Sequence, residues 1–314
     1  MHKTKTTNML KTKFLKLILI TSFIITHSTI YSKPMFLSDN VESDSTVKQF
    51  QILSKTYNSS SGLGYLNFRD FATSPLFYRG AMFNFSGGQT FVFSKIELDY
   101  KLGFNIYGAD AKIPKSSLIN PNAFSMGMGL DVEFSTLYQH SKLIFNKHRV
   151  QIGGVGVFTS NFRYNPFLGN NGLAADNLIN LMVSGRVVRD ISRTADKTIN
   201  LYLFKINLKP MKRDLIFQAD VGVLNINHRP GYAYSYEAEV IGTETDPVKW
   251  FFNDYKWSVN GWRLRTHLIY KTYNKKGRAQ SIAYVWEAFN AKGKIEPFQM
   301  ATHSIRFTRY LDLN

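Results

Sequence analysis

Hydrophobic and polar residues alternate along much of this chain, most regularly between Phe91 and Tyr107. The apolar members of that stretch are Val92, Ile96, Leu98, Tyr100, Leu102, Phe104 and Ile106, and between them stand Lys95, Glu97, Asp99, Lys101, Gly103 and Asn105. A repeat of two residues is typical of an extended strand with one apolar and one polar face. The stretch would be about 50 Å long, and about 9–11 residues suffice for a strand to cross a bilayer.

The same period recurs further along the chain. The alternation predicts 12 strands, at residues 62–71, 76–86, 91–107, 124–145, 149–163, 178–190, 198–208, 214–227, 231–241, 256–273, 278–289 and 298–311. Tight turns are expected at Ser86–Gln89 and His228–Gly231, and Gly153 and Gly154 are expected to mark a bulge. We therefore expect an all-β fold, a transmembrane antiparallel up-and-down β-barrel of about 12 strands.

The connections between these strands support a barrel with two different rims. If both chain ends lie at one rim, the long segments 108–123, 164–177 and 242–255 all fall on the other rim. Bacterial membrane barrels have long outer loops, short inner turns and an even strand number. The alternative is a soluble β-sandwich, in which an apolar face such as Val92–Ile106 would need a full partner sheet.

The first 32 residues have the features of a secretory signal peptide. Five lysines precede or enter a short apolar run, Phe14–Ile25, which small residues follow. The alternative is a helical membrane anchor, for which the run is short. The domain organisation we expect is a signal peptide at 1–32, a periplasmic linker or small plug at 33–61, and an outer-membrane β-barrel at 62–314.

Charge and composition narrow the possible partners. The chain carries a formal net charge of +17, which falls to +12 when the five lysines of residues 1–32 are removed, and 15% of its residues are aromatic. In an exported barrel this charge favours lipid phosphates or small anionic solutes as partners, and we expect no nucleic acid. The absence of cysteine excludes a lipid-anchored lipoprotein and disulfides.

The polar positions of the expected strands would line the barrel interior. The candidate lumen-lining or binding residues are Lys95, Glu97, Asp99, Lys101, Asp131, Glu133, Arg186, Glu237, Glu239, Arg263, Arg265, His267 and Arg306. Such a set would make either a charged pore or cavity, or a network of ion pairs that fills the lumen, because isolated buried charges are costly. Arg263, Arg265, His267 and Lys271 lie on one face of the expected strand 256–273. They would attract anions if unpaired, and Glu237 and Glu239 on the preceding strand are candidate partners that would neutralise them.

Catalytic and metal motifs are missing from the sequence. Lipid hydrolases built on membrane barrels use a His and a Ser two residues apart on one strand face, and the mature chain has no His-x-Ser. His303 and Ser304 are adjacent and would face opposite sides of a strand. The histidines show no metal-binding spacing. We therefore expect no catalytic residues, no metal and no cofactor.

The chain resembles bacterial outer-membrane β-barrel proteins in its signal-like start, its long alternating strands and its final strand, His303–Leu313. The segment Asn227–Tyr232 and the Lys-, Asn- and Tyr-rich composition resemble uncharacterised Bacteroidota-type barrels. The resemblance implies an outer-membrane location, outer-membrane lipid and the barrel-assembly machinery as partners, and non-enzymatic, porin-like passage or binding of small solutes, with anions favoured by the charge. A closed structural or accessory barrel is the main alternative, and a lipid hydrolase is a further one. Asn314 departs from the aromatic residue that ends many such barrels.

Overall fold

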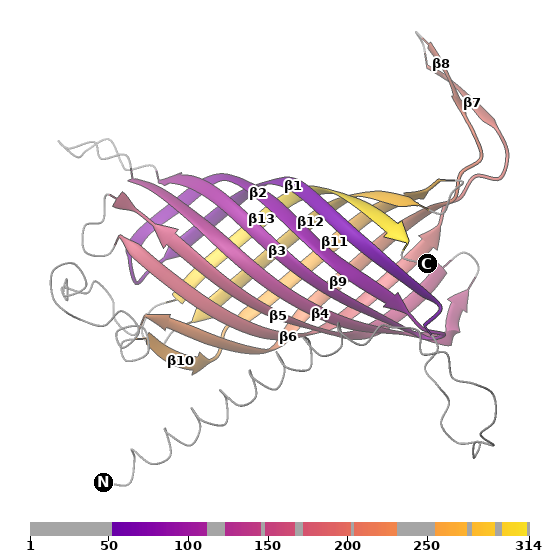
Figure 1. Cartoon of the computed structure of the whole chain (residues 1–314). Helices are drawn as coiled ribbons and strands as arrows, with labels where there is room; N and C mark the ends of the chain where they lie inside the picture. Colours follow the sequence, from indigo (N-terminus) through magenta and orange to yellow (C-terminus); the bar gives the residue numbers. More distant parts are fainter. Residues whose placement is uncertain are drawn as a thin grey trace, which may run out of the picture. The chain divides into compact units, whose positions relative to one another are not determined.

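The computed structural model describes residues 52–111, 123–145, 148–166, 172–201, 204–230, 255–274, 278–292 and 297–312. The predicted signal peptide and most of the predicted linker lie outside these ranges. Within them the chain is almost entirely β-structure (Figure 1). No helix among the described residues is both long and apolar enough to cross a membrane.

Thirteen strands follow one another along the chain. They are β1 (Ser54–Asp70), β2 (Ser74–Val92), β3 (Ile96–Ala111), β4 (Ala123–Phe145), β5 (His148–Tyr164), β6 (Leu173–Asp190), β7 (Lys197–Leu201), β8 (Phe204–Leu208), β9 (Arg213–Pro230), β10 (Tyr255–Val259), β11 (Trp262–Tyr273), β12 (Ala279–Lys292) and β13 (Pro297–Asp312).

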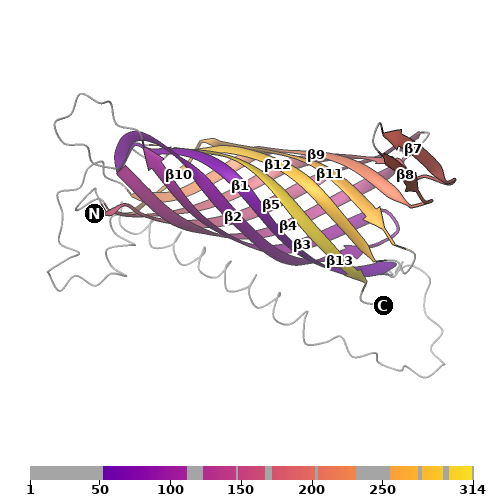
Figure 2. The same ribbon diagram turned by 90° about the horizontal axis from the view of Figure 1, so that it is seen from above.

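Ten of these strands close into a barrel. The ring runs β1-β2-β3-β4-β5-β6-β9-β11-β12-β13 and returns to β1, with every described pair of neighbours antiparallel. The strands are tilted, and the two views of the barrel show them crossing on its front and back walls (Figures 1 and 2). Closure leaves no free sheet edge along the paired stretches, so backbone N–H and C=O groups are satisfied within the wall.

Two short pieces of sheet stand apart from this ring. Among the described residues, β10 pairs only with Ile226–Pro230 of β9, beyond the part of β9 that pairs with β11. The chain passes from β10 into β11 through Gly261, whose φ of +91° is a left-handed conformation that favours glycine. Within the same ranges, β7 and β8 pair only with each other, as a separate two-stranded sheet.

The expected number of strands was therefore slightly too high. Residues 198–208 were predicted as one barrel strand and instead form parts of the hairpin β7–β8. β9 pairs with β6 on one edge and β11 on the other, so the ring closes without a strand from 231–241, residues that lie outside the described ranges. Alternation identifies an extended segment but not the strand with which it pairs.

Several expected boundaries were also wrong. β1 begins at Ser54 rather than at residue 62, so Ser59–Ser61 belong to the barrel wall and not to a linker. The turn expected at Ser86–Gln89 lies within β2, and the chain turns at residues 93–95. Gly88 is needed for close strand approach, since a Cβ there would stand 2.3 Å from the Tyr100 carbonyl oxygen. Gly153 and Gly154 pair in continuous register, so the bulge expected there is absent from β5.

The outer wall is broadly apolar, as the alternation predicted. Side chains at every second position of the long strands are exposed on it: Leu63, Phe83, Phe85, Leu102, Ile106, Met128, Phe134, Phe217, Val221, Ile282 and Ile305. A soluble monomer seldom exposes a continuous apolar surface of this extent. Exposed Tyr and Trp side chains occur toward both ends of the strands, at Tyr57, Tyr138 and Tyr270 on one side and Tyr164, Trp257 and Trp262 on the other.

Candidate functional site: the two halves of the lumen

The two ends of the barrel can be told apart by the strand ends they carry. We call the end with Ser54 and Asp312 the terminal rim, and the end with Asp70 and Pro297 the loop rim. Inward side chains differ between these ends, because a cluster of aromatic rings is buried near the loop rim, whereas a cavity lined by polar and charged side chains lies near the terminal rim.

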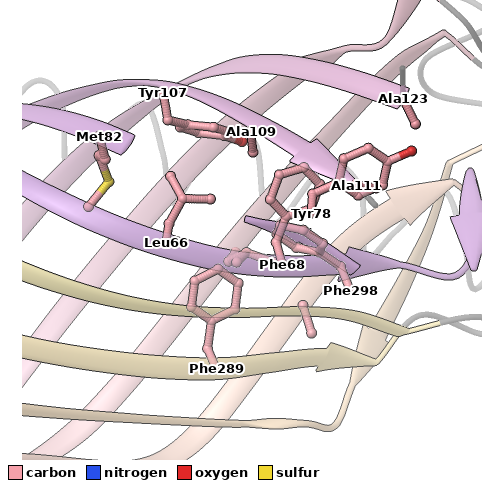
Figure 3. Close-up of a cluster of buried hydrophobic side chains, with 12 residues drawn as sticks. Leu66, Phe68, Tyr78, Met82, Tyr107, Ala109, Ala111, Ala123, Phe289 and Phe298 are labelled. Carbon is pink, nitrogen blue, oxygen red and sulfur yellow. The ribbon is translucent and has the colours of Figure 1, made fainter. Parts of the chain in front are cut away.

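A cluster of buried aromatic side chains fills the lumen near the loop rim (Figure 3). The ring of Phe68 stacks on Tyr78 with centroids 4.9 Å apart and an interplanar angle of 9°. Phe298 meets Phe68 edge-on at 6.1 Å and Phe289 at 5.6 Å, and Tyr107 meets Phe68 at 6.0 Å. Offset-stacked and edge-to-face pairs are the favoured aromatic geometries. These rings come from β1, β2, β3, β12 and β13, so they cover one side of the lumen.

Two arginines and two aspartates occupy the remaining space beside these rings, and we call them the buried quartet. Arg229 donates from Nε to Asp176 (2.6 Å), from Nη2 to Asp70 (2.8 Å) and from Nη1 to the Ala291 carbonyl (2.9 Å). Arg163 donates to Asp70 (2.6 Å) and also to Asp176. None of the four side chains is more than 4% exposed.

The buried quartet joins opposite walls of the barrel. Asp70 lies on β1 and Asp176 on β6, which are five strands apart in either direction around the ring. Arg163 on β5 also lies over the ring of Phe298, with its guanidinium carbon 3.8 Å from the centroid. Ion pairs and rings therefore cross the lumen at the same level. Because each carboxylate is bound by both arginines, the desolvation of these charges is offset by charge-assisted hydrogen bonds.

A second charged layer crosses the lumen nearer its middle. Arg265 donates to Asp220 (2.9 Å) and, across the interior, to Glu133 on β4. Arg263 donates from Nε to Glu287 (2.7 Å) and from Nη1 to the Thr159 hydroxyl (2.9 Å). These ion pairs are the filled-lumen alternative that the sequence left open, and they leave Arg263 and Arg265 without free charge.

A polar cavity occupies the half of the lumen next to the terminal rim, and we call it the vestibule. Its volume is about 750 Å³. Many of its lining side chains are small and polar: Ser54, Thr56, Asn58, Ser60, Thr90, Ser135, Ser281 and Thr308. Arg186 reaches across it to Glu97 (2.5 Å) and is held by Gln218, whose Oε1 accepts from Nε at 2.8 Å. This volume is within the range of pockets that hold small molecules, about 300–1,000 Å³.

The vestibule has more free basic groups than free acids. Within the part of the chain that the structure describes, four of its bases form no ion pair, namely Lys101, Lys212, Lys271 and Arg306. Only two of its acids lack one among these residues, Asp99 and Asp312. Asp99 accepts a hydrogen bond from the Thr90 hydroxyl at 2.6 Å. The free charge in this half is therefore positive, which raises the local concentration of anions.

The residues predicted to line the lumen fall into three groups. Ten line the vestibule or the middle layer: Glu97, Asp99, Lys101, Asp131, Glu133, Arg186, Arg263, Arg265, His267 and Arg306. Lys95 is exposed in the turn between β2 and β3, so its expected inward position was wrong. Glu237 and Glu239 lie outside the described ranges. The carboxylates that neutralise Arg263 and Arg265 are instead Glu287, Glu133 and Asp220.

The sequence-based selection missed the whole buried quartet. Arg229 was assigned to a tight turn, although it lies in β9. Arg163 ends the alternating inward series Thr159, Asn161, Arg163 on β5, so its position carried a usable signal. Asp176 stands in a segment that was predicted as loop and belongs to β6.

One arrangement in the lumen contains a serine, an acid and a histidine. Ser184 donates to Asp220 at 2.6 Å, and His267 Nε2 lies 3.5 Å from the same carboxylate. The acid therefore stands between the other two, which is the wrong order for a serine activated by histidine. On the outer wall, His303 is hydrogen-bonded to the Tyr284 hydroxyl (2.6 Å), and the adjacent Ser304 is buried inside. The described residues contain no group of three or more His, Asp or Glu side chains that could hold a metal ion.

No protein-family model matches this sequence, and no curated protein matches it. Solved structures of outer-membrane proteins resemble it in fold. The match to the translocator domain of the autotransporter NalP from Neisseria meningitidis spans 82% of this chain and 88% of the NalP chain, at 7% identity and a TM-score of 0.35. An outer membrane channel from Pseudomonas putida covers 85% and 100%, at 8% identity and a TM-score of 0.33. The outer membrane protein OprD from Pseudomonas aeruginosa covers 89% and 98%, at 9% identity and a TM-score of 0.18.

Proposed function

We propose that this protein is a non-enzymatic outer-membrane β-barrel that binds small anionic solutes in its vestibule. The observation that carries the proposal is the asymmetry of the lumen. A polar cavity of about 750 Å³ lies at the terminal rim, and the buried quartet and the aromatic cluster cross the lumen near the loop rim. Binding from one end is favoured over continuous passage, because large side chains and buried ion pairs fill the other end.

The outer wall supports a membrane location. Its exposed apolar side chains form the lipid-facing set that a membrane barrel needs, and Tyr and Trp stand toward both ends of the strands, as at the two interfaces of a bilayer. The even number of strands in the ring is typical of bacterial outer-membrane barrels. Export by a signal peptide at residues 1–32, outer-membrane lipid as surroundings and insertion by the barrel-assembly machinery belong to the same proposal.

The preference for anions rests on the free charges of the vestibule. Lys101, Lys271 and Arg306 line it without an ion pair among the described residues, whereas Glu97 and Glu133 are already bound by arginine. A cavity whose unpaired charges are mainly positive attracts negatively charged solutes. The basic cluster on 256–273, which would attract anions if unpaired, contributes less of this charge, because Arg263 and Arg265 form ion pairs with Glu287, Glu133 and Asp220.

A closed structural or accessory barrel is the second candidate, since the ion pairs that cross the lumen would serve it equally well. Two measurements on the purified protein separate the candidates: conductance across a planar bilayer, and calorimetric titration in detergent with citrate and with choline. We expect negligible conductance, saturable binding of citrate and no binding of choline.

Other outcomes identify the alternatives. Steady conductance that loses anion preference when Arg263 and Arg265 are changed to Glu would show an open pore and overturn the one-ended cavity. Absence of binding for both probes would favour the structural barrel. Turnover of phospholipid by the purified protein, lost on His303→Ala, would overturn the non-enzymatic assignment.

A further inference from the structure

A small chamber lies beside the floor of the vestibule, within the middle charged layer. Its volume is about 30 Å³, and it shares Lys101, Glu133 and Arg306 with the vestibule lining. A site of roughly 10–15 Å³ holds one water, so the chamber has space for about two water-sized occupants. It is too small for an organic solute of the kind that the vestibule would hold.

Two buried side chains that line the chamber have unused hydrogen-bonding atoms. Nη2 of Arg265 has no hydrogen-bond partner among the described residues, although the side chain is 5% exposed. The amide of Asn84, which is 4% exposed, is unpartnered among the same residues at both Nδ2 and Oδ1. A buried polar atom without a partner is costly, so these atoms point to an occupant of the chamber that they bind.

The basic groups at the chamber are available, but the acidic groups are already bound. In the described part of the chain Lys101 forms no ion pair, and Arg306 donates only to the Ser304 hydroxyl, from Nε at 3.1 Å. Each of the three carboxylates at the chamber already accepts hydrogen bonds: Asp131 accepts from Asn105 (2.7 Å) and Thr159 (2.6 Å), Glu133 accepts from Arg265, and Glu287 accepts from Arg263.

The unused donors of the chamber agree with these contacts. Four basic side chains line it, Lys101, Arg263, Arg265 and Arg306, against the three acids Asp131, Glu133 and Glu287, and Asp220, which is bound to Arg265, balances the fourth. Lys101 and Arg306, which form no ion pair among the described residues, the unused Nη2 of Arg265 and the unused Nδ2 of Asn84 are all suited to one monovalent anion. The unused Oδ1 of Asn84 needs a donor instead, and a water in the second position supplies it.

We propose that the chamber binds one small monovalent anion of about halide size, together with one water, between Lys101, Arg306, Arg265 and Asn84. The inference rests on the proposed function for its route of entry, which is the vestibule. The bound anion accepts hydrogen bonds from Arg265 and Asn84 and fixes Lys101 and Arg306 at the floor of the vestibule.

Bromide and chloride are the probes that test the chamber. We expect crystals of the full barrel soaked in sodium bromide to show an anomalous peak between Arg265 and Arg306. In detergent, sodium chloride should raise the unfolding temperature more than sodium gluconate at equal ionic strength, because an anion that binds only the folded state stabilises it, and gluconate is too large for the chamber.

Charge-removing variants at the chamber have matched controls elsewhere in the same strands. Arg306→Gln should weaken chloride binding about tenfold, the loss expected for one charge-assisted hydrogen bond, whereas Arg309→Gln on the outer face of β13 should leave it unchanged. Lys101→Gln on β3 should likewise weaken chloride binding, and Lys95→Gln in the turn before β3 is its control and should not. If Arg306→Gln does not fold, Asn84→Leu removes the amide without changing any charge and should also weaken the binding of chloride.

The results separate this inference from the proposed function. Equal stabilisation by chloride and gluconate, with no bromide peak, would overturn the chamber even if citrate still binds in the vestibule. A bromide peak that is lost in Arg306→Gln, in a protein that does not bind citrate, would support the chamber and overturn the vestibule instead.

Discussion

The two halves of the lumen are lined by the same ten strands, yet one is filled and the other holds a cavity of about 750 Å³. Both halves contain charged side chains, so charge alone does not decide whether the lumen is open. The difference lies in which side chains meet across the interior. Near the loop rim, aromatic rings and the buried quartet pack against one another from both sides of the lumen. Near the terminal rim, serines and threonines line the cavity together with larger side chains such as Arg186 and Tyr310. A ring of this size is intermediate between barrels filled by side chains and barrels with a channel, so side-chain volume sets the outcome level by level.

The largest expected difference between the halves is the cost of removing one arginine. Arg229→Met should destabilise the barrel by about 3–5 kcal/mol, because it leaves Asp70 and Asp176 buried with one arginine between them. Arg186→Met in the vestibule should cost about 1 kcal/mol or less, since the Arg186–Glu97 pair is partly solvated, with 16% and 23% of the side chains exposed. Urea-induced unfolding in lipid vesicles measures both, and equal losses would contradict the distinction between the halves.

Removing an aromatic ring should also destabilise the barrel more near the loop rim than in the vestibule, with a smaller difference in unfolding free energy. Phe298→Ala should cost about 3 kcal/mol, because Phe298 is fully buried and contacts Phe68, Phe289 and Arg163. Tyr310→Ala, on the same strand but lining the vestibule, should cost about 1 kcal/mol, because its ring borders a cavity and is packed on fewer sides. The same unfolding assay applies, and a larger loss for Tyr310→Ala would show that the vestibule is the packed half.

Accessibility to solvent can be compared on one strand, because the chain has no cysteine of its own. Thr308→Cys places a thiol in the vestibule, whereas Thr302→Cys places one nearer the loop rim in the same inward series of β13, where Thr302 is 6% exposed. A charged thiol reagent should modify the Thr308→Cys variant about a hundredfold faster, since reaching the thiol of the Thr302→Cys variant requires local opening. Similar rates for the two variants would mean that water fills both halves.

The strength of the alternation explains which parts of this fold the sequence predicted. Strands β3, β4, β9 and β11 have long apolar outer faces, and predicted lumen residues such as Lys101, Asp131 and Arg265 were placed correctly on the polar face. Glycines misled the prediction at Gly88, because a residue that permits close strand approach also favours turns. Residues 198–208 alternate as a barrel strand would, and only the pairing partners distinguish the hairpin β7–β8 from the wall.

The interior was harder to predict than the wall, for a geometric reason. Alternation tells which side chains face inward, but the ion pairs that cross the lumen depend on the register of strands far apart in the chain. Asp70 and Arg229 are separated by 159 residues, and Glu133 and Arg265 by 132. The sequence therefore indicated a charged interior and left open whether its charges were paired. The two halves of the lumen differ in how deeply these charges are buried and in the size of the side chains around them.

The smallest effect is expected when a positive charge is removed from the vestibule. The comparison with the arginines near the loop rim is direct, because the vestibule charge does not hold the wall together. Lys271 lines the vestibule with its ammonium 3.9 Å from the centroid of the Tyr310 ring and forms no ion pair among the described residues. Lys271→Gln should therefore leave unfolding by urea nearly unchanged and weaken citrate binding by up to about fivefold, the equivalent of a partly solvated charge worth about 1 kcal/mol or less. Lys95→Gln is the matched control, since Lys95 is exposed in the turn outside the cavity and should change neither quantity. A large loss of stability in Lys271→Gln would show that positive charge near the terminal rim supports the wall, as the arginines do near the loop rim, and would remove the difference between the two halves.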